Sequence, residues 1–321
     1  LESFFQYKFG RKMKPKLLLV GGWNWSATSP LIYTLQRNAR YAHFGFTKTF
    51  KYLHTKGLQN KLIDQPEKKA SFIYEKVCDG TWENYKSEEP FSHRMNLSID
   101  LEPLKDFPRN HFADLIAGNP TITKYLTYYH LLYDHVVSKG YKSVADGYVG
   151  QKFHKSSFKE YYEIIKSEFD VKMLLIARDP IRRAFSEYLA KVQKIYDKRR
   201  RRSLPIPFNV INYIKDIKKT YKIFGEENVH IIVMEEMWGD DGSAKKLLSE
   251  FLDHPVTDLW KNLYVPDRGH LVEYDKDVPC QAYGQDLLEL TPETYNYYKN
   301  KYQSVYDSWV KYFGELPMNW G

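Results

Sequence analysis

An arginine and a serine eight residues apart form the pattern in this sequence that best suits a charged ligand. Arg178 follows the apolar run at 172–177, and Ser186 comes two helical turns after Asp179-Pro180. A guanidinium offers a planar fork of donors that matches a phosphate, and a serine hydroxyl can add a neutral hydrogen bond. The same residues would also suit a capped helix start with surface arginines, so chemistry alone leaves both interpretations open.

A loop rich in glycine and hydroxyl residues follows a second apolar run, at 16–20. The loop begins with Gly21-Gly22, and its hydroxyls belong to Ser26, Thr28 and Ser29. Hydroxyls and backbone amides at the start of a helix can surround an anion, although such turns are also common in purely structural roles. No Gly-Lys-Ser/Thr follows at Walker A spacing, which removes the main support for magnesium-dependent ATP or GTP hydrolysis.

Both loops lie between a predicted strand and a predicted helix. The runs at 16–20 and 172–177 are short and apolar, which is typical of strands buried on both faces of a parallel sheet. After the first run, Ser29-Pro30 supplies an N-cap and a proline for the first helical turn. Further strands are predicted near 42–46, 143–145 and 229–234, and helices at 121–137, 157–169, 208–224, 243–252 and from 291, the last with a buried stripe of Tyr295, Tyr298, Tyr302, Val305 and Trp309.

This alternation of strands and helices predicts an α/β fold. We expect a P-loop-like central parallel sheet flanked by helices, in a single domain with long loops. Open parallel sheets bind ligands where strands end and helices begin, because unpaired backbone N–H groups and the positive end of the helix dipole meet there. The two loops described above are therefore the candidate binding elements.

The composition favours a folded protein whose surface attracts anions. The 321 residues are 43% apolar and 16% aromatic, which argues against disorder of the whole chain, and Lys and Arg outnumber Asp and Glu by 48 to 40. Nucleotide, anionic polysaccharide and nucleic acid stay open as partners, as does a role of the excess lysine in solubility alone. The basic run at 198–202 has the same alternatives: an anionic acceptor, a surface loop or nucleic acid.

Cysteine content and the start of the chain bear on its environment. Cys78 and Cys280 are too few for a disulfide framework or a cysteine-only zinc site, and one bridge between them stays open. No apolar run reaches the roughly 18 residues of a membrane span, and residues 1–16 are basic and aromatic rather than signal-like. A chain that begins with Leu1 is compatible with an excised catalytic region whose targeting segment is missing.

The string from Arg178 to Tyr188, Arg-Asp-Pro-x-x-Arg-Ala-x-Ser-x-Tyr, resembles the 3′-phosphate-binding motif of sulfotransferases that use 3′-phosphoadenosine 5′-phosphosulfate (PAPS). The resemblance implies that Arg178 and Ser186 hold the 3′-phosphate. The stretch 25–31, Trp-Ser-Ala-Thr-Ser-Pro-Leu, is similar to the family's 5′-phosphosulfate loop, written Lys-x-Gly-Thr-Thr-x-Leu. It implies cofactor contacts from the loop residues Gly22, Asn24, Trp25, Ser26, Ala27, Thr28 and Ser29.

The similarity runs in order from Lys16 to Trp320, and it most resembles Golgi carbohydrate sulfotransferases of the heparan sulfate type. It implies an N-terminal extension at 1–15 and a sulfotransferase domain at 16–321. The implied reaction is transfer of a sulfuryl group from PAPS to a hydroxyl or amine of a carbohydrate, leaving 3′,5′-ADP and requiring no metal. The loop at 265–270 lies where heparan-type enzymes cover the nucleotide, which implies contacts from Arg268 and Gly269, although a plain surface turn also fits.

One departure from the family concerns the cation beside the transferred group. Trp25 stands where the family has a lysine, and Ala27 stands where it has a glycine. By analogy with an oxyanion hole, losing one such donor costs on the order of 10²–10³ in rate. Lys48 is the best substitute, because residues 48–53 resemble the family's Lys-Glu-x-His-Phe-Phe segment, with a threonine and a lysine replacing the glutamate and histidine. Lys48 would equally suit a solvated surface.

Catalysis also needs a base that takes a proton from the acceptor. His43, His54, Asp146 and His154 lie in segments expected to reach the carboxyl edge of the sheet, and no feature singles one of them out. The glutamates at 235–236 are expected to fix neighbouring loops rather than to take protons.

Several alternatives stay open. The chain could be a small-molecule or tyrosyl-protein sulfotransferase, or a PAPS-binding or anionic-glycan-binding protein whose catalysis was weakened by loss of the loop lysine. A kinase with a degenerate phosphate loop is a further candidate. A nucleic-acid-binding protein has less support, because no recognised DNA or RNA signature accompanies the basic run. The compartment would be the Golgi lumen for a carbohydrate sulfotransferase and the cytoplasm otherwise.

Overall fold

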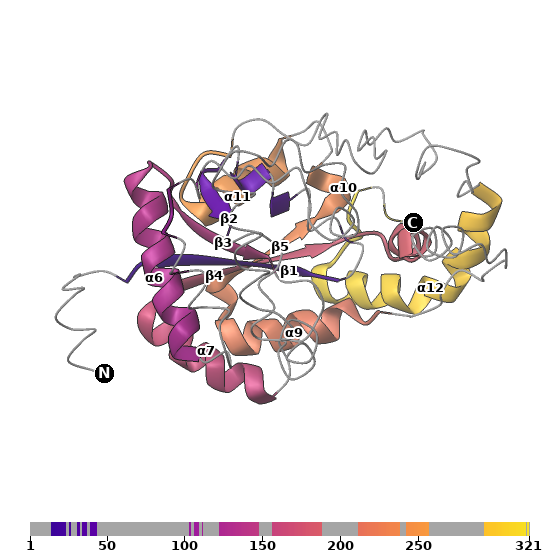
Figure 1. Cartoon of the computed structure of the whole chain (residues 1–321). Coiled ribbons are helices and arrows are strands. Elements are labelled where there is room, and N and C mark those ends of the chain that lie inside the picture. Colours follow the sequence, from indigo (N-terminus) through magenta and orange to yellow (C-terminus); the bar gives the residue numbers. More distant parts are fainter. Residues whose placement is uncertain are drawn as a thin grey trace, which may run out of the picture.

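A parallel sheet forms the centre of the molecule (Figure 1). The structure is a computed structural model that describes residues 14–43, 103–111, 122–147, 156–187, 211–237, 242–256 and 292–320, with gaps inside the first two ranges and at 319. In these ranges the sheet has five strands in the order β2-β3-β1-β4-β5, and every neighbouring pair is parallel. The strands are β1 Lys16–Gly22, β2 Tyr41–His43, β3 Ser143–Gly147, β4 Asp170–Ala177 and β5 Val229–Val233.

Helices cover both faces of the sheet. One core contains residues of α6 Ile122–Ser138, α7 Ser156–Glu168, α9 Tyr213–Phe224 and α12 Pro292–Phe313. The other contains residues of α10 Met234–Met237, α11 Ser243–Leu252 and the helical residues within 31–36. Figure 1 shows α6, α7 and α9 on one side of the sheet and α11 on the other. The expected α/β fold with helices flanking a central parallel sheet is confirmed.

The central strand shows why its sequence is apolar throughout. Leu17 and Leu19 point into the first core, whereas Leu18 and Val20 point into the second. All four side chains are at most 1% exposed. A central strand covered on both sides needs apolar residues at every position, so a continuous run rather than an alternating one marks it in the sequence.

Several boundaries differ from the expected ones. The strand expected at 42–46 is described only as Tyr41–His43, because the residues beyond lie outside the described ranges. The helix expected from 208 begins at Tyr213, because the Asn212 side chain accepts from the Lys215 N–H and caps the helix there. Met234, expected to end a strand, already belongs to α10. The buried stripe of the last helix is confirmed at Tyr302, Val305 and Trp309, while Tyr295 and Tyr298 are half-buried.

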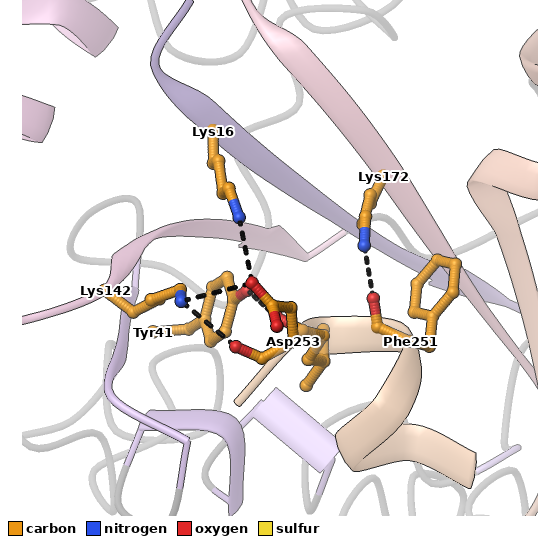
Figure 2. Close-up of polar contacts among 7 residues, drawn as sticks. Lys16, Tyr41, Lys142, Lys172, Phe251 and Asp253 are labelled. Carbon is orange, nitrogen blue, oxygen red and sulfur yellow. Dashed lines mark hydrogen bonds and ion pairs between the residues drawn. The ribbon is translucent and has the colours of Figure 1, made fainter. Parts of the chain in front are cut away.

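Three lysines contact the C-terminal end of α11 at the amino-terminal side of the sheet (Figure 2). The Nζ atoms of Lys16 and Lys142 lie 3.8 and 4.0 Å from Asp253 Oδ2, and Lys142 also donates to the Asp253 carbonyl at 3.1 Å. Lys172 donates to the Phe251 carbonyl. Cations at this end of a helix offset the partial negative charge of its last carbonyls. These lysines therefore serve the packing of α11.

Candidate functional site

The two candidate loops leave neighbouring strands at the same edge of the sheet. β1 pairs with β4 along its whole length, and Gly22 lies opposite Ile176, two residues before Arg178. The chain after β1 packs into one core through Leu31 and Leu35, whereas the chain after β4 packs into the other through Ile181 and Phe185. Adjacent parallel strands whose helices leave to opposite faces create a crevice at their carboxyl ends.

Arg178 and Ser186 are in direct contact at the second loop. Arg178 Nη1 donates to Ser186 Oγ at 2.8 Å, and Arg178 is 9% exposed. Residues 180–187 are helical, so two turns of helix bring the serine back beside the arginine. A guanidinium and a hydroxyl thus lie together at the carboxyl edge of the sheet, next to the end of β1.

Asp179 caps the helix that carries Ser186. Its Oδ1 accepts hydrogen bonds from the backbone N–H groups of Ile181 at 3.0 Å and Arg182 at 2.8 Å. This is the usual role of an aspartate at a helix N-terminus, where the first N–H groups have no partner in the helix. The aspartate therefore fixes the direction in which the helix leaves β4.

Two buried carboxylates connect this turn with β5 and the last helix. Asp179 Oδ2 accepts from the hydroxyls of Tyr295 and Tyr306, each at 2.9 Å. Glu235 Oε1 accepts from the Asp179 N–H at 3.0 Å, and its Oε2 accepts from Trp320 Nε1 at 2.9 Å. Burial, with the charge of Asp179 beside it, raises the pKa of Glu235 to about 7. These contacts agree with the expectation that this glutamate fixes neighbouring parts of the chain.

Tyr213 connects the two loops through α9. Its hydroxyl donates to the Arg178 carbonyl at 2.7 Å, and its ring packs edge-on against Trp23 with 4.4 Å between ring centroids. Trp23 follows β1 directly, is 1% exposed, and donates from Nε1 to Asp216 Oδ2 at 3.2 Å. Neither aromatic residue was predictable as part of the site, because a tyrosine at a helix start and a tryptophan in a loop carry no sequence signal of a shared contact.

The first loop is described only in part. Gly22 ends β1, and the N–H of Ser26 donates to the Trp23 carbonyl at 3.1 Å. Ser26 is fully buried, and its hydroxyl makes no hydrogen bond to another atom in the described ranges. A buried hydroxyl in this position can donate to an anion placed at the loop.

Two candidate bases lie on the strands beyond β1. Asp146 is opposite Leu19 in the neighbouring strand, is fully buried, and accepts from the Tyr125 hydroxyl at 3.2 Å. Burial and the charge of Asp146 raise the pKa of Tyr129. His43 ends β2, opposite Ala145 of β3. The structure thus places both residues near the carboxyl side of the sheet and gives Asp146 a partner in α6.

The remaining candidates from the sequence lie outside the described residues: Asn24, Trp25, Ala27, Thr28, Ser29, Lys48, His54, His154, Arg268, Gly269, the cysteines Cys78 and Cys280, and the basic run at 198–202.

Among the described residues, no group of three or more His, Cys, Asp or Glu side chains could hold a metal ion. None of the helices in those ranges combines the length and the apolar character that a membrane crossing requires.

A cavity of about 1230 Å³ lies at the opposite, amino-terminal edge of the sheet, between Lys16, Lys142, Lys166 and Asp170 among other residues. Lys166 Nζ is 2.6 Å from Glu163 Oε2, and both Lys16 and Lys142 contact Asp253. Lys14, which also lines the cavity, donates to the Lys166 carbonyl at 2.8 Å. Because each of these cations already has a partner, the carboxyl edge with Arg178 is the better candidate for an anion site.

No family model matches the chain, and no curated protein matches it. Among solved structures, it is similar to a sulfotransferase from Alicyclobacillus acidocaldarius at 13% identity and a TM-score of 0.44, covering 96% of this chain and 98% of that one. It is also similar to the sulfotransferase domain from the curacin biosynthetic pathway, at 14% identity, a TM-score of 0.42 and 76% coverage of both chains. A third similar structure is sulfotransferase STF9 from Mycobacterium avium, at 14% identity and a TM-score of 0.33, covering 80% of this chain and 69% of that one.

Proposed function

We propose that this protein is a PAPS-dependent sulfotransferase whose cofactor binds at the carboxyl ends of β1 and β4. The observation that carries the proposal is the contact between Arg178 and Ser186 at 2.8 Å, at a helix start next to the end of β1. In the proposal these two side chains hold the 3′-phosphate, and the loop after Gly22 holds the 5′-phosphosulfate. The domain responsible is 16–321, after the extension at 1–15.

The described residues fit such a cofactor in two respects. The guanidinium of Arg178 and the hydroxyl of Ser186 provide charge and a neutral donor at one loop. At the other loop, the buried hydroxyl of Ser26 has no partner in the described ranges and can donate to an oxygen of the phosphosulfate. When bound, PAPS would supply the sulfuryl group, and the protein would supply orientation and positive charge.

The remaining roles follow from the sequence. Lys48 is proposed as the cation that offsets charge on the departing oxygen, and Arg268 and Gly269 as further nucleotide contacts. His43, His54 and Asp146 are the candidate bases for the acceptor hydroxyl or amine. Of these, Asp146 is fully buried and already accepts a hydrogen bond from the Tyr125 hydroxyl. The acceptor proposed is a carbohydrate, with the basic run at 198–202 available to an anionic glycan.

A transfer assay tests this function. The protein is incubated with sulfur-labelled PAPS and a panel of glycans, peptides and small phenols and alcohols. We expect wild type to label at least one acceptor class, Arg178→Ala to lose most of that activity, and Lys48→Ala to lose turnover while it keeps its affinity for 3′,5′-ADP. Lys246→Ala, which removes an exposed positive charge on α11, is the matched control. Equal labelling by wild type and Arg178→Ala would contradict the proposed site.

A second candidate function has one specific observation in its favour. Trp25 stands where the resemblance calls for a lysine, so a protein that binds the nucleotide without transferring sulfate is the main alternative. Tight binding of 3′,5′-ADP by wild type, without labelling of any acceptor in the panel, would favour this alternative.

A further inference from the structure

The peptide unit between Arg178 and Asp179 is held at both of its polar groups. Its carbonyl, on Arg178, accepts from the Tyr213 hydroxyl at 2.7 Å, and its N–H, on Asp179, donates to Glu235 Oε1 at 3.0 Å. Since a peptide unit is planar, fixing both groups fixes its orientation. That orientation sets the direction in which the Arg178 side chain leaves the end of β4.

The side chain of Asp179 is fixed just as fully. Its two oxygens accept four hydrogen bonds within the described part of the chain, at 2.8 to 3.0 Å. Two of the donors are N–H groups of its own helix, and the other two are the hydroxyls of Tyr295 and Tyr306 in α12. These tyrosines lie 116 and 127 residues away in sequence. The last helix therefore holds the capping residue of the Arg178 turn.

Trp320 holds the other carboxylate. Its indole N–H donates to Glu235 Oε2 at 2.9 Å. The centroid of its ring lies 4.5 Å from the ring centroid of Trp309 and 5.8 Å from that of Tyr213. Asp179, Glu235 and Trp320 are at most 5% exposed. The C-terminal segment thus reaches both sides of the 178–179 peptide, through Glu235 on one side and the aromatic cluster around Tyr213 on the other.

Apolar contacts alone would hold α12 on the sheet at lower cost than this network. Burying two carboxylates costs free energy, and the hydrogen bonds that they accept offset this cost rather than add net stability. Burial and the charge of Asp179 raise the pKa of Glu235 to about 7. What the carboxylates add is direction, because a hydrogen bond constrains angles that an apolar contact leaves loose. The direction fixed here is that of the Arg178 turn.

We infer that Tyr295, Tyr306 and Trp320 are positioning residues, which set the affinity of Arg178 for the 3′-phosphate without touching the nucleotide. This inference rests on the proposed function for its ligand. The C-terminal segment acts on the binding site indirectly, through Asp179 and Glu235. By linkage, a nucleotide that needs the Arg178 turn in place also stabilises the contacts of Trp320.

The test compares two nucleotides that differ in the 3′-phosphate. Calorimetry gives Kd for 3′,5′-ADP and for 5′-AMP in wild type, in the double variant Tyr295→Phe/Tyr306→Phe and in Trp320→Phe. We expect each variant to raise Kd for 3′,5′-ADP about tenfold and to leave Kd for 5′-AMP within about twofold, since loosening Arg178 affects only the 3′-phosphate. Tyr297→Phe, on the exposed face of the same helix, is the control and should change neither value. An equal rise in both Kd values, or no rise, would overturn the inference.

Hydrogen exchange separates this inference from the proposed function, because it needs no ligand. We expect exchange at the N–H groups of Ile181 and Arg182 to be faster in the double variant and in Trp320→Phe than in wild type, and unchanged in Tyr297→Phe. If wild type does not bind 3′,5′-ADP, the proposed function fails, and exchange alone then decides whether the C-terminal segment holds the turn. Unchanged exchange in both variants would show that it does not. Trp320→Phe serves as the test if the double variant does not fold.

Discussion

Tyr213 is the residue that joins the two loops of the candidate site. Its ring contacts Trp23 after β1, and its hydroxyl holds the carbonyl of Arg178 after β4. The residue is 1% exposed, so its hydroxyl has no water to replace a lost partner. At the scale of single residues, the site therefore depends on a hydrogen bond to the backbone as well as on the side chains of Arg178 and Ser186.

Tyr213→Phe tests that dependence. The change keeps the ring against Trp23 but leaves the buried Arg178 carbonyl without its donor, which should cost about 1–3 kcal/mol of unfolding free energy. We also expect weaker binding of 3′,5′-ADP, because the turn that carries Arg178 loses one of its two fixed points. Urea denaturation and calorimetry measure the two effects. Tyr221→Phe, at a half-buried position on the same helix, is the control, and an equal loss in both variants would refute this role for the Tyr213 hydroxyl.

A buried glutamate and a half-buried histidine give opposite pH dependences. The pKa of Glu235 is about 7 in the folded chain against an ordinary 4.5, so the folded chain binds the proton of this glutamate more firmly than the unfolded chain does. The contribution of Glu235 to stability is therefore complete below pH 4.5 and is lost as pH rises through 7. Burial lowers the pKa of His230 from 6.5 to about 4, so its contribution is complete above pH 6.5 and is lost as pH falls through 4.

Substituting each residue should therefore change the pH profile in opposite directions. As pH increases from 4.5 to 7, the stability of Glu235→Gln should rise relative to that of wild type. As pH increases from 4 to 6.5, the stability of His230→Gln should fall relative to that of wild type. Each change should amount to at most about 3 kcal/mol across its window. Denaturation curves at several pH values measure both. Variant curves that run parallel to wild type would show that neither group titrates in its window.

At the scale of elements, α11 shows which interactions hold a helix to this sheet. Lys16, Lys142 and Lys172 contact its C-terminal end, as Figure 2 shows, while Leu248 and Leu252 lie in the core beneath it. Asp253, the acidic partner of two of these lysines, has a side chain that is 79% exposed. Ion pairs in such a position contribute little, and burial of leucine contributes much more.

We accordingly expect Leu248→Ala to cost about 2–5 kcal/mol of unfolding free energy and Lys142→Ala less than about 1 kcal/mol. Only the lysine contribution should shrink further in high salt, because ions screen exposed charges. Urea denaturation at low and high sodium chloride measures both. A cost of Lys142→Ala as large as that of Leu248→Ala would mean that the lysines, rather than the apolar core, hold α11 in place.

The elements were largely predictable from the sequence, because continuous apolar runs mark strands buried on two faces and helical spacing marks the stripe on α12. Their order in the sheet was not. Nothing local shows that β3 inserts between β2 and β1, since strand pairing depends on contacts distant in sequence. For the same reason the stripe predicted that residues of α12 are buried, but not that Tyr295 and Tyr306 would bind Asp179.

The candidate site was predictable to a similar degree. The spacing of Arg178 and Ser186 predicted that the two residues share a site, and the structure brings their side chains into contact. Asp146, named as a candidate base from its place after a strand, is a buried acceptor of the Tyr125 hydroxyl. That environment comes from the packing of α6 on the sheet, which no short stretch of sequence specifies.

At the scale of the whole molecule, the sheet brings together loops that are about half the chain apart. β1 and β4 lie side by side although more than 150 residues separate Gly22 from Ile176. The last helix, drawn in yellow in Figure 1, closes on the same end of the sheet through Asp179. The N-terminal, central and C-terminal parts of the chain thus meet at the carboxyl edge of β4.

A calorimetric titration with 3′,5′-ADP tests the central claim most directly. The claim is that the ends of β1 and β4 bind one nucleotide and that Arg178 holds its 3′-phosphate. We expect wild type to bind 3′,5′-ADP with a dissociation constant in the micromolar range or lower, more tightly than 5′-AMP, and Arg178→Ala to lose about 10- to 100-fold of that affinity. Lys246→Ala should bind as wild type does. Wild type that binds neither nucleotide, or Arg178→Ala that binds 3′,5′-ADP as tightly as wild type, would contradict the claim.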